Sequence, residues 1–246
     1  MQESWKVAAL GGFTGAVLAL AVTFGTAALG VAPFAADGKA MHAYLLAHPD
    51  VIVEMTNKLQ AQQDAQDDTT RQSAVRKVGL KAYFDPRVAF VTGPANAKTT
   101  VVEFFDYNCP YCRASVPAMK KFYQTHKDVR FSFIEFPIKG PQSTVAARAA
   151  MAARKQPDKY LAFHFALMSQ DGLVDKNTVF AIAQTSGLDV AKLKTDMESS
   201  SVDYALAAAH TLAQSSGIDG TPAFIVNGRI REGAVTDDDL AQMSKI

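Results

Sequence analysis

The chain is short of cysteine, since its 246 residues contain only Cys109 and Cys112. A structural zinc site needs about four ligands, and the sequence offers neither a second cysteine pair nor histidines in paired spacing. Covalent haem attachment through C-x-x-C needs histidine directly after the second cysteine, where Arg113 stands. We therefore expect no metal and no cofactor.

An excess of charge of one sign is also missing. The chain has 25 Lys and Arg against 24 Asp and Glu, a formal net charge of +1. Nucleic-acid-binding domains are usually strongly basic, so we do not expect nucleic acid as a partner. Hydrophobic residues make up 48% of the chain, which is typical of a globular protein, and residues 85–246 are enough to bury a substantial core.

What the sequence does contain is a single C-x-x-C motif directly after an apolar run. Residues 99–105 are rich in β-branched and aromatic side chains and predict a buried strand. Apolar residues then recur at helical spacing over 113–126, so Cys109 falls at a helix start, where free backbone N–H groups and the helix dipole favour a thiolate. Cys109 is the predicted attacking thiol, Pro110 suits the first turn, and Cys112 is the predicted resolving thiol.

A purely structural disulfide is the simpler alternative for this motif. It would close so short a loop that its entropic effect on the unfolded chain is small. We therefore interpret the motif as a redox dithiol.

At the N-terminus, residues 7–36 carry no charge and lie between Lys6 and Asp37. The run is long enough to span a bilayer, and it also contains a segment of signal-peptide length. We expect residues 1–36 to be an export signal, either cleaved or, as we favour, kept as an inner-membrane anchor with Lys6 inside. Export places the dithiol in the periplasm, under oxidising conditions.

Residues 37–84 form a second predicted unit, a helical oligomerisation segment and linker. Residues 60–73 have almost no large apolar side chain and predict a solvated helix or a mobile linker. The unit has too few apolar residues to bury a core of its own, so we expect its apolar stripe to pack against copies of itself. Packing back onto the catalytic domain is the alternative. The stripe consists of Leu45, Ile52, Met55 and Leu59.

The rest of the chain alternates between strand and helix signals. Residues 144–215 are expected to be helical, with Phe163, Phe165, Leu167 and Met168 in a core and His164 as a surface or hydrogen-bonded histidine. Residues 237–245 predict a closing helix capped by Thr236. Strands are expected at 88–91, 101–105, 129–136, 223–226 and 229–233. The strands at 101–105 and 129–136 are expected to form a β-α-β unit with the helix between them. The last two strands are expected to form a hairpin around Asn227-Gly228.

Two segments carry a resemblance to a known family. Val102 to Cys112, together with Gly220 to Gly228, resembles the DsbA-like branch of the thioredoxin superfamily over about residues 85–246, and is most similar to ScsC-type and alphaproteobacterial DsbA proteins. The resemblance implies an α/β thioredoxin fold with a helical insert at about 142–216, preceded by an N-terminal helical stalk. It also implies oligomerisation through that stalk, as a homotrimer.

The resemblance further implies roles for residues around the dithiol. Pro222 would be the cis-proline that faces the dithiol, with Thr221 offering backbone groups to a substrate strand, although an ordinary turn proline is the alternative. Glu103 would lie beneath the dithiol as a buried carboxyl that exchanges protons with Cys112, unless it is a solvated glutamate. Tyr111 stands where strongly oxidising members usually have histidine, which predicts a milder oxidant.

We therefore expect an exported thiol:disulfide oxidoreductase that acts on unfolded or misoxidised exported proteins and is recycled by a membrane redox partner. The N-terminal unit, Tyr111 and Thr221 favour disulfide isomerase or reductase activity. The alternatives are a DsbA-like dithiol oxidase and a redox-independent export chaperone. Cys-Pro-Tyr-Cys is also the glutaredoxin motif, but the export signal and the helical insert argue against that class.

Overall fold

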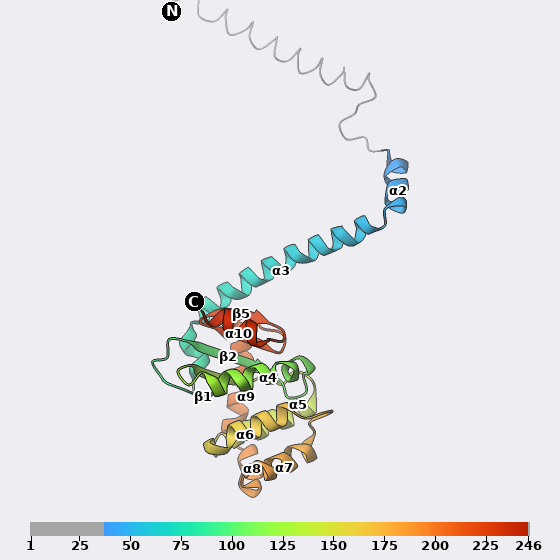
Figure 1. The fold of residues 1–246 in the computed structure, drawn as a ribbon. Helices are drawn as coiled ribbons and strands as arrows, with labels where there is room; N and C mark the ends of the chain where they lie inside the picture. The colour runs from blue at the N-terminus through green and yellow to red at the C-terminus, as the bar shows by residue number, and fades with distance from the viewer. Residues whose placement is uncertain (1–36, 246) are drawn as a thin grey trace, which may run out of the picture. The chain divides into compact units, whose positions relative to one another are not determined.

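The structure, a computed structural model, describes residues 37–245 (Figure 1). The chain divides into two units, of which the first ends at residue 62 and the second begins at residue 63. Among the described helices, none combines the length and the apolar character needed to cross a membrane. The predicted export segment, residues 1–36, lies outside the described residues.

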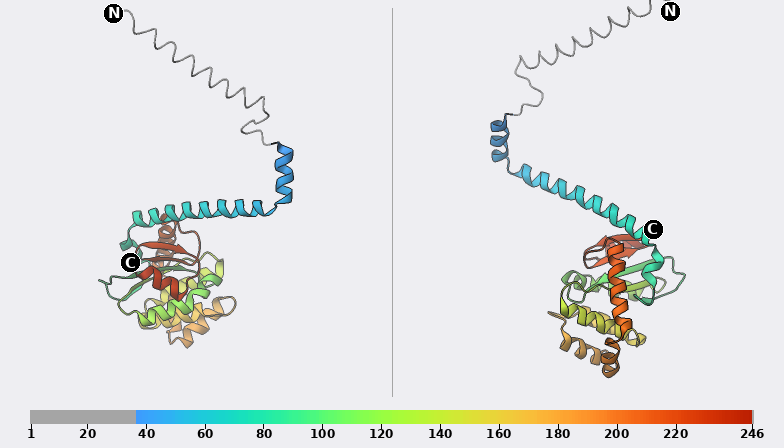
Figure 2. Two further views of the ribbon diagram at one scale, coloured as in Figure 1. Left: turned by 45° about the horizontal axis from the view of Figure 1, so that its top comes forward. Right: turned by 180° about the vertical axis from the view of Figure 1, so that it is seen from behind.

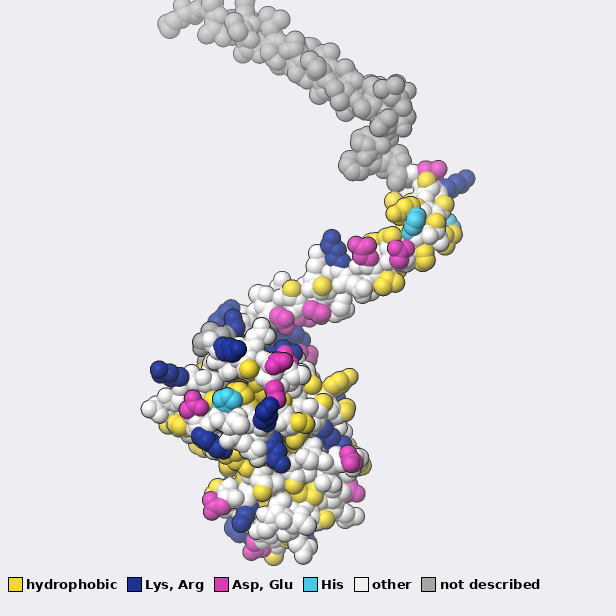
Figure 3. Space-filling view, viewed as in Figure 1, with side chains coloured by type: hydrophobic (Ala, Val, Ile, Leu, Met, Phe, Trp, Pro, Cys, Tyr) yellow, Lys and Arg dark blue, Asp and Glu magenta, His cyan; other side chains and the backbone are white. Residues whose placement is uncertain are grey.

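The first unit contains helix α2 (Gly38–Ala47) and the beginning of helix α3 (Asp50–Val78). Asp37 caps α2 by accepting a hydrogen bond from the backbone N–H of Lys39. No residue of 37–62 is buried, and Figure 3 shows hydrophobic side chains along this segment. The exposed large apolar side chains here are Met41, Tyr44, Leu46, Ile52, Val53, Met55 and Leu59. Helix α3 continues without a break through residues 60–73, so the helical alternative predicted for that stretch holds.

The second unit is built on a five-stranded sheet in the order β1-β3-β2-β4-β5. Strands β2 and β3 are parallel and joined by helix α4 (Pro110–Thr125), which confirms the predicted β-α-β unit. The other neighbouring pairs are antiparallel. The strands are β1 (Phe90–Thr92), β2 (Thr100–Phe105), β3 (Arg130–Glu135), β4 (Ala223–Val226) and β5 (Arg229–Glu232).

The sheet separates two cores, because alternate side chains of each strand point to opposite faces. On β2, Val101 and Phe105 join a cluster that contains both cysteines, here called the dithiol-side core. Val102 and Phe104 join the opposite core with Tyr83, which lies in the short 3-10 helix η1 (Leu80–Phe84). Helix α9 (Ser200–Ser215) runs behind the sheet as seen in Figure 1, and the view from behind in Figure 2 shows it uncovered.

The helical insert follows β3, as the resemblance implies. Helices α5 (Pro141–Ala153), α6 (Pro157–Met168), α7 (Lys176–Thr185) and α8 (Val190–Met197) precede α9. The apolar residues of α6 predicted to be core are buried. His164 on the same helix is buried and hydrogen-bonded, so the surface position considered for it is wrong.

Two local features match their sequence signals closely. Asn227 and Gly228 join β4 to β5 with positive φ angles of 51° and 80°, the conformation that a two-residue type I′ turn requires. Helix α10 (Asp237–Ser244) begins with a capping box between Thr236 and Asp239. The predicted strand 88–91 instead starts at Phe90, because the preceding backbone N–H groups turn back to the carbonyl of Asp85.

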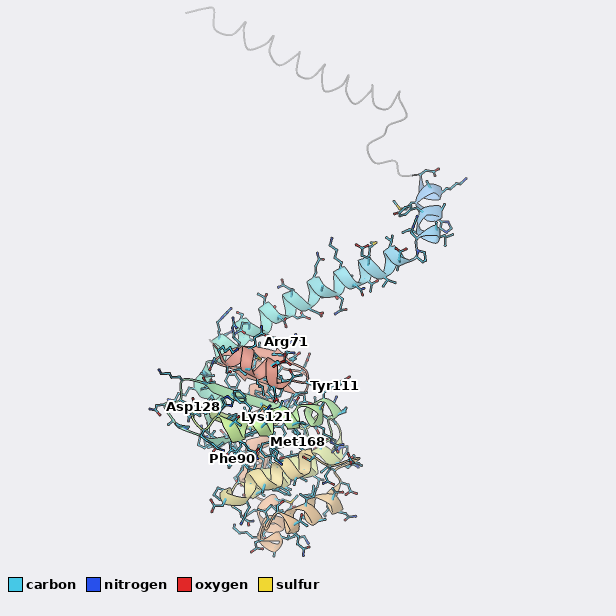
Figure 4. All side chains as sticks on the ribbon, in the orientation of Figure 1. Arg71, Phe90, Tyr111, Lys121, Asp128 and Met168 are labelled. Carbon is cyan, nitrogen blue, oxygen red and sulfur yellow. The ribbon has the colours of Figure 1, made fainter. Side chains whose placement is uncertain are left out.

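The second unit begins well before residue 85, where the sequence placed its boundary. Val75 is buried in the opposite core, and the side-chain amide of Gln72 bonds to the backbone of Gly228 and Ile230 along the outer edge of β5. Arg71, labelled in Figure 4, lies 3.4 Å from the carboxylate of Glu232. This part of α3 is held largely by polar contacts to the sheet edge, which an apolar pattern does not reveal.

Candidate active site

The two cysteines lie where the β2 strand passes into helix α4. Cys109 is the N-cap residue with extended backbone (φ −85°, ψ 120°), Pro110 is the first helical residue, and Cys112 lies in the first turn. Both thiols are free and buried. Tyr111 between them is 65% exposed and lies at the N-terminal end of α4 in Figure 4. Of the four motif residues, Pro110 and Tyr111 are therefore exposed at the surface while both cysteines are buried.

The environment of Cys109 favours its thiolate. The thiol of Cys112, the Thr221 side chain and the backbone N–H groups of Cys112 and Tyr111 donate toward the sulfur and, against the opposing effect of burial, lower its pKa to about 5. Burial raises the pKa of Cys112, and its hydrogen bond to Cys109 raises that pKa further. One sulfur is therefore ionised at neutral pH while the other keeps its proton.

The loop before β4 approaches Cys109 from the other side. The peptide bond between Thr221 and Pro222 is cis, as the resemblance implies, and the thiol of Cys109 lies 3.1 Å from the carbonyl oxygen of Thr221. The approach follows from sheet pairing, since β4 runs antiparallel to β2 with Ala223 opposite Phe104.

Glu103 lies in the middle of β2 and is 3% exposed, so the solvated alternative is wrong. Alternation along the strand points it to the dithiol side of the sheet, with Val101 and Phe105. Burial raises its pKa to about 8, and its charge in turn raises the pKa of Cys112. The Glu103 carboxyl therefore lies on the dithiol side of the sheet, and burial favours its protonated form.

Two residues that were not predicted hold the loop between β2 and α4. The buried carboxylate of Asp106 accepts hydrogen bonds from the backbone N–H of Asn108 at 2.7 Å, of Ile138 at 2.7 Å and of Lys139 at 2.8 Å. Asn108 pairs in both directions with the backbone of Val174 in the helical insert. The available signal was the presence of two polar residues, Asp106 and Asn108, between the apolar strand and Cys109.

Comparison with protein families identifies two matching regions. A sequence model of the DSBA-like thioredoxin domain matches residues 100–245. A model of the Copper resistance protein ScsC N-terminal domain matches residues 38–66. The first match contains the dithiol, the helical insert and the Thr221-Pro222 pair, and the second contains the exposed apolar side chains of α2 and of the beginning of α3.

Curated relatives match over part of their length. The chain is 29% identical over 166 residues to "Na(+)/H(+) antiporter NhaA 1" of Salinispora arenicola, covering 67% of this chain but 25% of that protein. It thus spans about a quarter of the length of this relative. It is 32% identical over 135 residues to "Thiol:disulfide interchange protein DsbA" of Bordetella parapertussis, covering 54% of this chain and 65% of that protein.

Solved structures are similar over most of their length. A thioredoxin-like oxidoreductase from Silicibacter pomeroyi shares 42% identity with a TM-score of 0.62, covering 66% of this chain and 92% of that one. A linker-deletion mutant of Proteus mirabilis ScsC shares 26% identity with a TM-score of 0.64, covering 86% of this chain and 94% of that one. These similarities confirm the thioredoxin-like fold and the resemblance found in the sequence.

Proposed function

Because this chain belongs to the DSBA-like thioredoxin domain family, we propose that it is a thiol:disulfide oxidoreductase acting on exported proteins through Cys109 and Cys112. The observation that carries the proposal is the placement of two free thiols at the N-cap and in the first turn of α4, where their pKa values shift in opposite directions. A low pKa creates a nucleophile and a good leaving group, while a high pKa keeps the second thiol silent until it is needed.

The exchange proceeds in two steps. The Cys109 thiolate attacks one sulfur of a substrate disulfide, forming a mixed disulfide and releasing the other substrate sulfur as a thiolate. Cys112 then gives its proton to the ionised form of Glu103 and attacks the Cys109 sulfur, which closes the Cys109–Cys112 disulfide and releases the second substrate sulfur as a thiolate. The substrate gains two electrons and the protein loses them. The reverse sequence donates a disulfide to a reduced substrate.

Substrate chains are proposed to bind where Thr221, Pro222 and Tyr111 surround the dithiol. The contact between Thr221 and Cys109 supports this site, because a substrate strand passing Thr221 would come alongside the sulfur. Tyr111 adds an exposed aromatic surface. Pro110 keeps the first turn of α4 in helical geometry without a surplus N–H group.

Within this class we propose disulfide isomerase or reductase activity, with DsbA-like oxidase activity as the second candidate. Tyr111 supports the choice, since it cannot place a positive charge beside the thiolate as histidine does. The match of residues 38–66 to the ScsC N-terminal domain supports it as well. A membrane redox partner is proposed to keep the dithiol reduced for isomerisation or oxidised for oxidation.

Refolding of scrambled ribonuclease discriminates these activities. Wild type should restore ribonuclease activity, Cys109→Ser should not, and Cys112→Ser should accumulate the mixed disulfide. Failure to restore activity together with rapid oxidation of reduced ribonuclease would make the protein an oxidase. If Cys109→Ser protects unfolded clients as well as wild type does, and wild type shows no thiol exchange, the chaperone alternative is correct.

We further propose that the protein is a homotrimer held by residues 37–62. The seven exposed large apolar side chains of this segment support the proposal, since so many apolar side chains on a short segment are costly to leave in water. Light scattering should show the mass per particle fall about threefold on deletion of residues 37–62 or in Leu46→Lys/Met55→Lys. An unchanged mass in both variants would rule out this assembly.

Residues 1–36 are proposed to direct export to the periplasm and to tether the chain to the inner membrane. Their uncharged run supports the proposal. Cell fractionation followed by N-terminal sequencing tests both parts. A soluble periplasmic chain that begins after the apolar run would support export and refute tethering. A cytoplasmic chain would refute both.

A further inference from the structure

The dithiol-side core contains polar groups that the exchange reaction does not use. Tyr107 from the loop before Cys109, Glu135 from the end of β3 and His164 from α6 are each at most 2% exposed. They come from three parts of the unit, namely the active-site loop, the sheet and the helical insert. Burial of polar side chains at this depth is costly unless they are paired, so their arrangement needs a reason.

The hydroxyl of Tyr107 joins the other two side chains. It donates to Oε1 of Glu135 at 3.1 Å and lies 3.0 Å from Nδ1 of His164. A tyrosine hydroxyl has one proton to give and can also accept, so it can serve both neighbours when Nδ1 carries the histidine proton. Aromatic rings enclose the cluster, with Phe105 packed edge-on against Tyr107 and Tyr160 stacked on His164.

Burial disfavours the charged form of every member of the cluster. Burial raises the pKa of Glu135 and of Tyr107 well above their ordinary values, and burial lowers the pKa of His164 to about 3. The charged or titratable groups that act on Glu135 from neighbouring elements do not reverse this, since burial is the largest influence. These groups are Tyr107, Asp106, Arg154 and Glu103.

Tyr107 is tied to the dithiol through its main chain. It precedes Cys109 by two residues, and its carbonyl oxygen accepts a hydrogen bond from Nε of Arg113 at 3.1 Å. The backbone N–H of Arg113 in turn donates to the carbonyl of Cys109 at 3.2 Å. A shift of Tyr107 would therefore move the first turn of α4, whose N–H groups stabilise the Cys109 thiolate.

We propose that Glu135 and His164 are positioning residues for the thiol exchange, which through the Tyr107 hydroxyl hold the loop that presents Cys109. The assignment rests on the proposed function of the dithiol. It also gives the helical insert a direct role, because His164 belongs to α6 and ties that helix to the active-site loop.

A pair of matched substitutions tests the assignment. Tyr107→Phe removes the hydroxyl of the cluster, while Tyr83→Phe removes an equally buried hydroxyl that bonds to Ser216 at 2.6 Å in the opposite core. Both variants should unfold at lower urea concentration than wild type. Only Tyr107→Phe should raise the pH midpoint of Cys109 ionisation, followed by thiolate absorbance, by half a unit or more, which is about a threefold loss of thiolate below the midpoint.

Glu135 is tested by rescue. Glu135→Gln keeps an oxygen acceptor for Tyr107 without a charge and should retain the wild-type midpoint, whereas Glu135→Leu should shift it as Tyr107→Phe does. A wild-type midpoint in Tyr107→Phe, or equal shifts in Glu135→Gln and Glu135→Leu, would overturn the assignment. If Glu135→Leu does not fold, the two tyrosine variants decide alone.

The test separates this inference from the proposed function, because the thiolate titration needs no substrate. An acidic Cys109 that depends on Tyr107 but performs no exchange would refute the proposed function and leave the anchoring intact. Normal thiol exchange together with a Cys109 midpoint that does not change in Tyr107→Phe would support the proposed function and refute the anchoring role of the cluster.

Discussion

The sulfur of Cys109 lies 3.1 Å from the carbonyl oxygen of Thr221, although 112 residues separate them along the chain. The helix start alone would favour a thiolate at Cys109, but it would leave the sulfur open on its other side. The antiparallel pairing of β4 with β2 closes that side. The reactive sulfur is therefore positioned jointly by two parts of the sheet that are remote in sequence.

The first prediction concerns the source of the low thiol pKa. Cys112→Ala should raise the ionisation midpoint of Cys109 above the wild-type value of about 5, because the Cys112 thiol is the largest stabilising donor. The midpoint should stay below 9, the ordinary value, because backbone N–H groups remain. Thiolate absorbance measures it, with Cys112→Ser as the control that keeps a hydroxyl donor. An unchanged midpoint in Cys112→Ala would show that the Cys112 thiol does not lower the pKa of Cys109.

A second prediction follows for the stability of the reduced protein. The folded pKa of Cys109 is depressed from 9.0 to about 5, so its ionisation stabilises the fold above the unfolded pKa, and this stabilisation is lost as pH falls through about 5. Relative to Cys109→Ala, wild type should lose stability steadily from pH 9 to pH 5 in urea unfolding under reductant. If the difference in unfolding free energy between wild type and Cys109→Ala does not vary with pH, ionisation of Cys109 does not stabilise the fold.

The third prediction concerns Glu103, whose shift has the opposite sign. Its folded pKa is raised from 4.5 to about 8, so the folded state is increasingly destabilised as pH rises through that range. Glu103→Gln should be more stable than wild type by at most about 5 kcal/mol at pH 9, at 1.36 kcal/mol per pH unit, and equally stable near pH 4.

The same substitution should slow the second step of exchange, because the glutamine amide cannot accept the Cys112 proton. The exposed Glu198→Gln serves as the control and should change neither property. Stability is measured by urea unfolding across pH, and the second step by the lifetime of the mixed disulfide. A stability gain that is equal at pH 4 and pH 9 would mean that the pKa of Glu103 is not raised in the folded protein.

The fourth prediction concerns the edge of the sheet. Gln72→Ala removes two hydrogen bonds, one to the carbonyl of Gly228 at 2.7 Å and one from the N–H of Ile230 at 3.1 Å. It should destabilise the protein by about 1–2 kcal/mol and speed hydrogen exchange at the Ile230 amide. Gln63→Ala, at an exposed position of the same helix, should do neither. Unaltered exchange at Ile230 would show that this contact does not protect the edge.

Local signals predicted most of the fold correctly. The hairpin at Asn227-Gly228, the capped helix after Thr236 and the helix start at Cys109 each depend on neighbouring residues only. The start of the second unit was not predicted, because the contacts that hold it join residues far apart in the sequence. Gln72 and Arg71 have no apolar signature, and their partners Ile230 and Glu232 come from the last strand.

In the active site, too, features that depend on distant residues could not be predicted from local sequence. Polar residues next to the motif, such as Asp106 and Asn108, hold the loop through partners that lie far along the chain. Whether Glu103 faced solvent or the core could not be decided from an apolar strand without a clean polar face. Helices α4 and α6 both contribute to the core on that side of the sheet, and this packing is a tertiary property.

The sequence by itself determined that a cysteine pair begins a helix after a buried strand, because strand and helix periodicity and the N-terminal proline act over a few residues. Only the tertiary structure decided how acidic each group there is. Desolvation of Glu103 and Cys112, the approach of Thr221 to Cys109 and the Tyr107 cluster all arise from side chains that packing brings together. A pKa reports the surroundings of a group, and in this protein those surroundings come from distant segments.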